Sequence, residues 1–339
     1  MIDLCPYFFA FIIAFAATAI SMGPLRAALS KYLKDTPSGL KNHQGIIPIV
    51  GGCAVALGFY ASLIIIRLAT TFPSGTLRNL RGIFYGGFII FTLGLIDDLR
   101  KPKGLTPYIK LFFQAIAAII LIHYDIYIQF LPNPWGYILT VLWVIGVTNA
   151  FNLIDIMDGL AISQAALAAL AFGLIAMPSE FIYVNFAALA LAGAAFGFWP
   201  YNHSKKYKTF LGDSGSLLLG FLLSALALGT NYTTINPLGV FCAILILALP
   251  LFDTAFVSIA RLSKGISPLT GTADHFPLRL VRLGLKKKTI LLLSILVAVV
   301  WDALAFWITK TTTITALIIY TFTLLTLILF AVFLKYKTE

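Results

Sequence analysis

The sequence predicts an all-α integral membrane protein, a helical bundle that crosses the bilayer about eleven times. Hydrophobic residues fill 60% of the 339 positions and only 11% are charged, so polar side chains are too few to cover a water-facing surface. The mean hydropathy of +0.95 agrees with this. Apolar windows of about 20 residues, enough to cross ~30 Å of hydrocarbon, recur along the whole chain. Lysine and arginine concentrate in alternate loops, as in multi-pass proteins.

Glycine, proline, asparagine and charged clusters divide the chain into the expected helices. The first apolar run is too long for a signal-peptide core and has only Asp3 as a charge before it, so we expect it to be retained as a helix. The connection around Lys310 is very short, which leaves ten crossings as an alternative to eleven. We expect the whole chain, 1–339, to form one membrane domain. The expected helices begin near residues 4, 45, 80, 107, 134, 159, 180, 213, 237, 288 and 311.

The distribution of basic residues predicts the orientation. When alternate loops are assigned to opposite sides, one side, which includes the C-terminal tail, holds 20 of the 24 lysines and arginines. The other side has only Arg67, Arg78, Arg81 and Lys310. The positive-inside rule therefore places the C-terminus in the cytoplasm and the N-terminus outside. Topology also explains the net charge of +11, so no nucleic acid partner is implied.

Two other classes of protein are disfavoured. Cys5, Cys53 and Cys242 lie in or beside apolar segments and form no CxxC pair, so neither a disulfide framework nor a zinc site is implied. An ion-coupled secondary transporter would need charged or broken-helix sites near the bilayer midplane. Only Asp253 and Asp302 lie well inside expected helices, and the sequence has no internal repeat. Transport therefore remains only as an alternative.

Acidic residues gather on the cytoplasmic side. Ionisable groups at the membrane interface are usually functional, and these loops are far apart in sequence but share one face. This grouping predicts a polar site at the inner interface. The acids concerned are Asp97, Asp98, Asp155, Asp158, Asp213 and Asp274.

Asp97 and Asp98 end the third expected helix. Adjacent carboxylates suit Mg²⁺ binding or proton abstraction from a phosphate, because like charges in close quarters raise one pKa. The alternative is a solvated helix end balanced by Arg100, Lys101 and Lys103. Acids at a helix C-terminus oppose the macrodipole, so another group should stabilise them.

The segment from Asn149 to Gly159 places polar groups every three residues. At about 100° per residue, a continuous helix would point Asn149 and Asp158 in opposite directions. We therefore expect the fifth helix to break between Asn152 and Asp155, so that the later groups turn into a shared site. The alternative is an ordinary helix-end turn, for which Asn and Asp are common residues.

Asp213 stands where the eighth helix is expected to begin, among small residues. Free amide groups at that end suit phosphate, and the carboxylate suits the Mg²⁺ that would bridge it. The alternative is that Asp213 only caps the helix.

The last cytoplasmic loop is basic. Lys286 to Lys288 are assigned to membrane anchoring. Arg261 and His275 are better candidates for binding substrate phosphates, although a loop histidine is often a bystander.

In this order, the motifs resemble those of the polyprenyl-phosphate N-acetylhexosamine-1-phosphate transferase superfamily, glycosyltransferase family 4. The resemblance extends from Asp35 and His43 to His275. Its most specific parts are the pair Asp97 and Asp98 followed by Pro107 and 110–114, the segment 149–159, and the segment 210–216.

The resemblance implies a Mg²⁺-dependent enzyme, with Mn²⁺ as a substitute. It would transfer a sugar 1-phosphate, N-acetylglucosamine 1-phosphate by preference, from a UDP-sugar to undecaprenyl phosphate or another polyprenyl phosphate. UMP would be released, and the lipid diphosphate sugar would serve cell-envelope glycan synthesis. The expected location is the bacterial inner membrane, among its lipids, with the active site on the cytoplasmic face. The sequence leaves a homodimer open.

The resemblance also implies roles for single residues. Asp97 and Asp98 would handle and activate the lipid phosphate, without an indication of which one is the base. Where the family has a His-x-His-His run, this chain has His275 followed by Phe276 and Pro277. The peptidoglycan branch of the family typically carries adjacent histidines in this loop, so their absence disfavours the alternative phospho-MurNAc-pentapeptide transferase. The remaining roles are Mg²⁺ binding for Asp213, nucleotide binding for Asn152, Asp155, Asp158 and Phe210, and phosphate binding for Lys110 and His275, with Arg261 as a further candidate.

Overall fold

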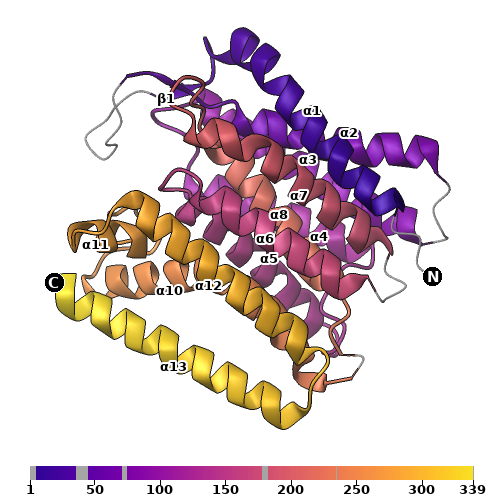
Figure 1. The fold of residues 1–339 in the computed structure, drawn as a ribbon, viewed down its shortest axis with the longest axis vertical. Helices are drawn as coiled ribbons and strands as arrows, with labels where there is room; N and C mark the ends of the chain where they lie inside the picture. Colours follow the sequence, from indigo (N-terminus) through magenta and orange to yellow (C-terminus); the bar gives the residue numbers. More distant parts are fainter. Residues whose placement is uncertain (1–4, 36–44, 71–74, 178–181, 234, 339) are drawn as a thin grey trace. The chain divides into compact units, whose positions relative to one another are not determined.

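The computed structural model describes residues 5–35, 45–70, 75–177, 182–233 and 235–338, most of which are in helices (Figure 1). In this part of the chain, strand is limited to β1 (Lys34–Asp35) and β2 (Ile47–Pro48), which pair antiparallel. Contacts divide the chain into two compact units, Met1–Thr230 and Asn231–Glu339. Each unit is described by itself, and the single membrane domain stays a prediction.

The first unit is a bundle in which α8 contacts α2, α3, α5, α6 and α7. This central position explains why α8 is the most deeply buried of the long apolar helices. The helices of the unit are α1 (Cys5–Leu29), α2 (Gly51–Ala69), α3 (Thr76–Leu99), α4 (Pro107–His123), α5 (Trp135–Ile154), α6 (Leu160–Ala176), α7 (Ile182–His203) and α8 (Gly212–Gly229).

The second unit begins with a bent segment. A 3₁₀ turn and a short helix, together Pro237–Ile246, meet the next helix at 70°. Two long apolar helices follow after a loop that carries a helix of seven residues. The elements are η1 (Pro237–Phe241), α9 (Cys242–Ile246), α10 (Ala248–Ser263), α11 (Phe276–Arg282), α12 (Lys287–Ile308) and α13 (Thr313–Thr338).

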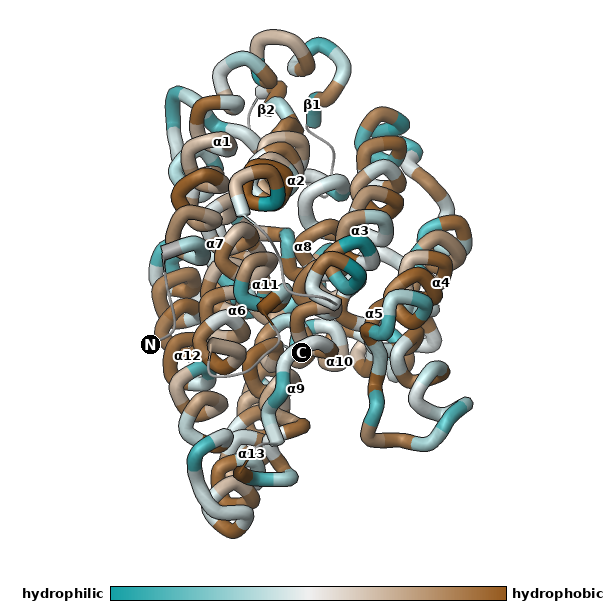
Figure 2. The backbone as a smooth tube through the Cα atoms, turned by 90° about the vertical axis from the view of Figure 1, so that its right-hand side faces the viewer, coloured by the Kyte–Doolittle hydropathy of each residue, from teal (hydrophilic) through white to brown (hydrophobic). Residues whose placement is uncertain are grey.

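The all-α membrane class is confirmed. Eight of the described helices are long and apolar enough to cross a bilayer, and the bent pair would make a ninth. The 17-residue helices α4 and α6 are apolar but shorter. Hydrophobic residues run along the helices and hydrophilic ones gather at their ends and in loops (Figure 2). The number of crossings and the orientation stay predictions.

Every expected window contains a helix that begins within a few residues of the expected start. The largest difference is in the second window, where α2 begins at Gly51 rather than near residue 45. Ile47 and Pro48 are instead used in β2, because they pair with Asp35 and Lys34.

The close approach of α3 to the start of α8 depends on Gly94. A Cβ atom at this position would lie 2.5 Å from both the carbonyl oxygen of Asp213 and the Cα of Ser214. Residues three and four positions further along a helix share its face, so Asp97 and Asp98 also meet the start of α8. Because residue 94 has no side chain, α3 and α8 pack closely, and the carboxylates of Asp97, Asp98 and Asp213 come together.

The orientation can be tested by cysteine labelling. The α7–α8 connection carries Lys205 and Lys206, so the positive-inside rule puts it in the cytoplasm. In a chain whose native cysteines are replaced by alanine, Ser204→Cys should react with an impermeant maleimide only in inverted vesicles. Thr233→Cys, at an exposed position after α8, should react only in intact cells. The opposite pattern would place the acidic site on the outer face and contradict the orientation.

Candidate active site

Charged residues of α3, α4 and α8 form an alternating chain in the first unit. The Lys110 Nζ lies 3.0 Å from Asp97 Oδ2 and 2.7 Å from Asp213 Oδ2. The Lys101 Nζ lies 2.6 Å from Asp98 Oδ1 and 3.3 Å from Asp213 Oδ1. One continuous ion-pair chain thus runs through Asp97, Lys110, Asp213, Lys101 and Asp98, with Asp213 at its centre.

Asp98 also holds the N-terminus of α8. Its carboxylate accepts hydrogen bonds from the backbone amides of Asp213 at 3.0 Å and Ser214 at 2.9 Å. The turn before these amides needs Gly212, whose φ is +77° and where a Cβ would lie 2.6 Å from Asp98 Oδ2. The expectation of free amides for phosphate is therefore wrong at these two positions, because a carboxylate already uses them.

The simpler alternatives for the three acids are wrong. Asp97 and Asp98 are only 3% and 2% exposed, so they do not form a solvated helix end. The capping position of α8 is Leu211, and the Asp213 side chain meets lysines rather than backbone amides. Asp97 accepts a further hydrogen bond from the Leu105 amide at 2.6 Å. The stabilising groups that acids at the end of α3 require are thus the two lysines and three backbone N–H groups.

The electrostatics of this site favour an added cation. Burial alone would lower the pKa of the Lys101 ammonium, but the carboxylates of Asp213 and Asp98 outweigh that effect and raise it. Burial, reinforced by the negative charge of Asp213, raises the pKa of Asp155 well above its ordinary range. The three carboxylates of the ion-pair chain already face only two lysines, so a fourth negative charge on Asp155 is unfavourable unless a cation is added.

The donor set fits Mg²⁺, which prefers carboxylate oxygens and water. Among the described residues, no three acidic, histidine or cysteine side chains converge as a ready-made metal cluster. Lys101 and Lys110 lie between the carboxylates instead. A divalent cation would thus replace lysine contacts at Asp213 and supply the charge that the site lacks.

The predicted break in the fifth helix is confirmed. α5 ends at Ile154, and Asp155 is its C-terminal cap residue. Before the break, Asn152 donates to Ser216 Oγ on α8 at 2.9 Å. Asn152 therefore ties α5 to α8 just beneath the ion-pair chain, and Asp155 lies in the turn that follows.

A pair of amide side chains sets the position of α4 against α5. The Asn149 Nδ2 donates to Gln114 Oε1 at 2.7 Å, and the Gln114 Nε2 donates back to Asn149 Oδ1 at 3.4 Å. Gln114 is fully buried and lies one helical turn after Lys110. The amide pair therefore fixes the rotation of α4 that presents Lys110 to Asp97 and Asp213.

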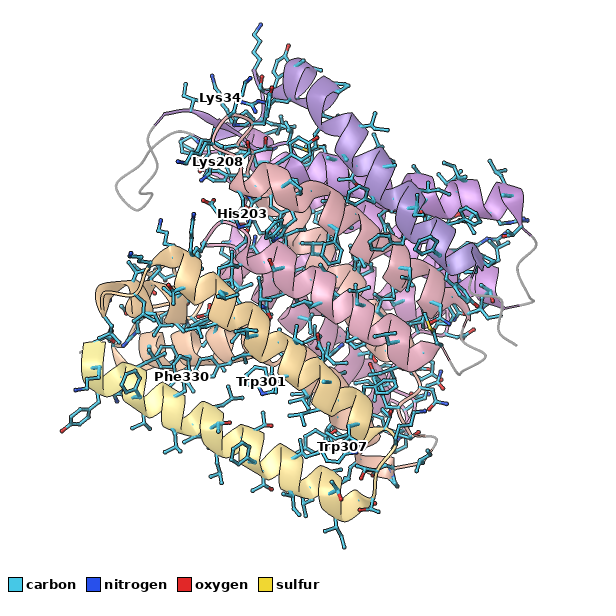
Figure 3. The ribbon with its side chains drawn as sticks, viewed as in Figure 1. Lys34, His203, Lys208, Trp301, Trp307 and Phe330 are labelled. Carbon is cyan, nitrogen blue, oxygen red and sulfur yellow. The ribbon has the colours of Figure 1, made fainter. Side chains whose placement is uncertain are left out.

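Asp158 and Phe210 are brought together by Lys208. The Lys208 Nζ forms an ion pair with Asp158 and lies 5.5 Å from the centre of the Phe210 ring. Lys208 lies at the same end of the unit as Lys34 and His203 (Figure 3). The aromatic ring and the ion pair would together border a nucleotide.

Sequence reasoning missed three residues of this site. From the sequence, Lys101 is expected only to balance the charge of a solvated helix end, although its spacing of three residues after Asp98 is a usable signal, and Lys208 has no expected role beyond loop charge. Asn202 is 4% exposed; it accepts from the Gly159 amide and donates to the Thr209 carbonyl. The only signal for Asn202 was a polar residue at the end of an apolar helix. It joins the turn after α5 to the loop before α8.

The second unit holds His275 and Arg261. His275 is 4% exposed, and its Nδ1 lies 2.7 Å from Asp253 Oδ2, so it is not a bystander on an open loop. Arg261 is 1% exposed and donates to Thr272 and to the Pro268 carbonyl. Its Nη2 is buried and has no hydrogen-bond partner among the described residues. Both side chains thus stay candidates for an anion, and both also organise the loop between α10 and α12.

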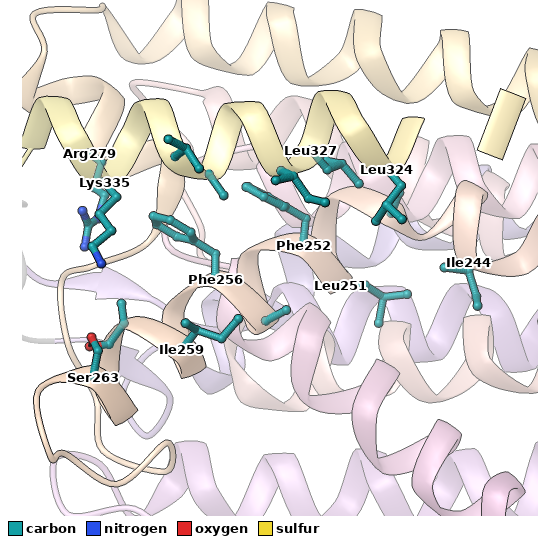
Figure 4. A pocket seen from close by; sticks show the side chains of 16 residues that line it. Ile244, Leu251, Phe252, Phe256, Ile259, Ser263, Arg279, Leu324, Leu327 and Lys335 are labelled. Atoms are coloured by element: carbon teal, nitrogen blue, oxygen red, sulfur yellow. Dashed lines mark hydrogen bonds between the residues drawn. The ribbon is translucent and has the colours of Figure 1, made fainter. Parts of the chain in front are cut away.

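An apolar groove of about 510 Å³ runs between α10 and α13 in the same unit (Figure 4). Arg279 and Lys335 lie at one end of it. Burial alone would raise the pKa of nearby Asp274, but its contacts with Lys264 and Arg279 outweigh burial and lower it. The groove thus combines a long hydrocarbon surface with a cationic end. Its apolar walls include Leu251, Phe252, Phe256, Leu324, Leu327 and Ile328.

The capping role of Asp98 predicts a stability effect. Asp98→Ala would leave two backbone amides without their acceptor and Lys101 with Asp213 as its remaining carboxylate partner, a loss of about 2 kcal/mol or more. The apparent melting temperature in detergent should fall by roughly 4–8 °C. Lys103→Ala, in the same loop but outside the ion-pair chain, should leave it unchanged. Equal melting temperatures for both variants would contradict the capping role.

Comparison with known proteins agrees with this geometry. The model of glycosyl transferase family 4 matches residues 80–231, which include the complete ion-pair chain. A probable undecaprenyl-phosphate N-acetylglucosaminyl 1-phosphate transferase of Bacillus subtilis (strain 168) is 30% identical over 287 residues, 82% of this chain and 77% of that protein. The undecaprenyl-phosphate alpha-N-acetylglucosaminyl 1-phosphate transferase of Yersinia pestis is 28% identical over 320 residues, 86% of this chain and 80% of that protein.

The enzyme of the same name from Escherichia coli (strain K12) is 28% identical over 280 residues, 78% of this chain and 74% of that protein. These relatives cover most of both chains, and the matched family region contains the acids and lysines that the fold brings together. The chain therefore belongs to glycosyl transferase family 4, the polyprenyl-phosphate N-acetylhexosamine-1-phosphate transferases that its motifs resemble.

Proposed function

We propose that this protein transfers N-acetylglucosamine 1-phosphate from UDP-N-acetylglucosamine to undecaprenyl phosphate, at the cytoplasmic face of the bacterial inner membrane. The observation that carries the proposal is the ion-pair chain around Asp213, inside the region that the family model matches. The names of the curated relatives support the acceptor and the sugar. UDP-sugars are cytosolic, so the predicted orientation supports the location.

In the proposed reaction, an oxygen of the lipid phosphate attacks the phosphorus that carries the sugar. The bond from that phosphorus to the UMP oxygen breaks, which leaves a lipid diphosphate sugar and UMP. Catalysis of such transfers depends on positioning and on charge stabilisation. The lysines of the ion-pair chain supply positive charge, and its acids supply a site for a cation and a proton acceptor.

The hydrogen bonds favour Asp97 over Asp98 as the proton acceptor. Both oxygens of Asp98 accept backbone amides of α8, and one also meets Lys101. Asp97 accepts one amide and pairs with Lys110. A carboxylate whose oxygens cap a helix would lose those hydrogen bonds when it is protonated, so it is poorly suited to accept and release a proton. We therefore assign the base to Asp97 and the capping role to Asp98.

Asp213 is the proposed Mg²⁺ ligand, with the neighbouring carboxylates beside it. The ion would neutralise the diphosphate of the donor when bound. The side chain of Asp213 is 18% exposed, so it is more accessible than Asp97 and Asp98, the other two acids of the ion-pair chain. Lysines that give up their contacts with Asp213 would then be free to donate to phosphate oxygens.

The groove between α10 and α13 supports a long apolar acceptor. From Leu324 to Lys335 the wall follows α13 for roughly 16 Å, about the depth of one leaflet. One segment of an isoprenoid chain fits such a surface, and the exposed Lys335 at its end suits a phosphate. We propose that this groove binds part of the polyprenyl chain.

The sequence after His275 supports N-acetylglucosamine over the muramoyl-pentapeptide. Phe276 and Pro277 are buried at the start of α11 and leave no adjacent histidine for a larger donor. Transport is not supported, because the relatives are named as transferases and Asp253 is hydrogen-bonded to His275 and the Phe276 amide.

The test is an assay with purified protein, undecaprenyl phosphate, Mg²⁺ and labelled UDP-N-acetylglucosamine. The proposal expects a lipid-soluble labelled product and an equal amount of UMP. UDP-N-acetylmuramoyl-pentapeptide, added as a competitor, should be a poor donor. Preferential use of the pentapeptide would reject the proposed sugar, and no product from either donor would reject the proposed reaction.

Removal of the proposed metal ligand should abolish this turnover. Asp213→Asn keeps the shape of the side chain but weakens its hold on a divalent cation, so activity should fall by ~10³-fold or more. EDTA should abolish wild-type activity, and Mg²⁺ or Mn²⁺ should restore it. Asp125→Asn removes an exposed carboxylate in the α4–α5 loop and serves as the control with normal activity. Full turnover in EDTA would rule out the metal assignment.

Filling the groove should weaken acceptor binding only. Ala331 lines the groove, whereas Leu329 on the same helix does not line it and is 66% exposed. Ala331→Trp should raise the KM for undecaprenyl phosphate by roughly tenfold, since each excluded CH₂ costs ~0.8 kcal/mol. The KM of Ala331→Trp for the donor should stay unchanged. Leu329→Trp should keep the wild-type KM for both substrates. Equal acceptor KM values for the two variants would exclude the groove as the chain site.

A further inference from the structure

A buried acid and imidazole pair in the second unit has no part in the mechanism described so far. Asp253 lies on α10 and is 0% exposed. Its Oδ2 lies 2.7 Å from the Nδ1 of His275, and its Oδ1 accepts the Phe276 amide at 2.9 Å. Both oxygens of a fully buried carboxylate are thus used by two consecutive residues at the start of α11.

These contacts decide which nitrogen of His275 carries the hydrogen. An ionised carboxylate can only accept, so Nδ1 must be the donor. Nε2 is left for other partners, and no residue in the described part of the chain makes a hydrogen bond to it. The ring is therefore held with one defined nitrogen for a ligand, as occurs when a carboxylate orients a functional histidine.

We propose that Asp253 is a positioning residue for the transfer reaction, which acts by holding His275 with its hydrogen on Nδ1 and leaving Nε2 for a phosphate oxygen of the substrate. This inference rests on the proposed function and on His275 as a candidate for a substrate phosphate. An ionised phosphate oxygen can only accept, so the form of His275 that binds it carries a hydrogen on both ring nitrogens, with Nδ1–H still bonded to Asp253. The Nε2–H then donates a charge-assisted hydrogen bond to the phosphate.

The simpler reading is that Asp253 only caps α11, because the Phe276 amide is the first N–H of that helix. A substitution that keeps the cap and changes the histidine separates the two readings. In Asp253→Asn the amide of Phe276 can only donate, so the carbonyl oxygen of the new side chain must face it. The NH₂ group then faces His275 and donates to Nδ1, which moves the ring hydrogen to Nε2 and blocks a second proton on Nδ1.

The first measurement is ¹⁵N NMR of full-length protein labelled at histidine, in detergent. The His275 signals are assigned by their absence in His275→Gln. Wild type should carry the hydrogen on Nδ1, and Asp253→Asn should carry it on Nε2. Asp274→Asn, which removes an acid one residue before His275 that binds Lys264 and Arg279, should keep the wild-type pattern. An unchanged Nδ1–H in Asp253→Asn would overturn the proposal.

The second measurement is kinetic. Asp253→Asn and His275→Gln should each lower kcat/KM for the donor by about 10–100-fold, with melting temperatures near that of wild type. Because Asp253 acts through His275, the double variant should be no slower than His275→Gln. If the losses of the two single variants multiply in the double variant, or if Asp253→Asn has a normal rate, then Asp253 only caps α11. Normal turnover in His275→Gln would remove the phosphate role of His275, whereas absence of UMP release in wild type would remove the reaction itself.

Discussion

Burying carboxylates at the meeting point of α3, α4 and α8 is the constraint on which the first unit depends. Each buried ion costs several kcal/mol unless it is paired and hydrogen-bonded. The chain meets this cost by alternating acids with lysines and by adding backbone N–H groups of Leu105, Asp213 and Ser214. Gly94 allows the helices to approach closely enough for these contacts, and the Gln114–Asn149 pair keeps α4 turned toward them.

Such an arrangement is better suited to chemistry than to stability. A buried ion-pair network is often no more stable than well-packed apolar residues, so its presence needs another reason. Here two lysines share one central carboxylate, Asp213, which is the most accessible acid of the ion-pair chain. A diphosphate with a divalent cation carries both kinds of charge and can replace both kinds of contact. The network therefore keeps these charged side chains in place before the ligands bind, so that binding needs little rearrangement.

Local features of the site could be predicted from the sequence, and long-range ones could not. The break of α5 before Asp155 follows from the three-residue spacing of its polar groups, and the positions of Asp97 and Asp213 follow from the limits of apolar windows. The capping of α8 by Asp98 joins residues 115 positions apart, and no local pattern encodes it. The 70° bend before α10 was missed because Leu247 continues an apolar run. His43, part of the motif resemblance, lies outside the described residues.

The two units solve the problem of a carboxylate in a membrane helix in the same way. Asp98 on α3 accepts two amides in the first turn of α8 and pairs with Lys101, while Asp253 on α10 accepts the first amide of α11 and pairs with His275. In each case the acid satisfies exposed N–H groups at a helix start, where the dipole favours negative charge. In each case its remaining capacity orients a side chain that can donate to phosphate. A neutral isostere separates the chemistry from the fold only at Asp253, where a single oxygen accepts a backbone amide, because both oxygens of Asp98 are needed to accept the amides of α8.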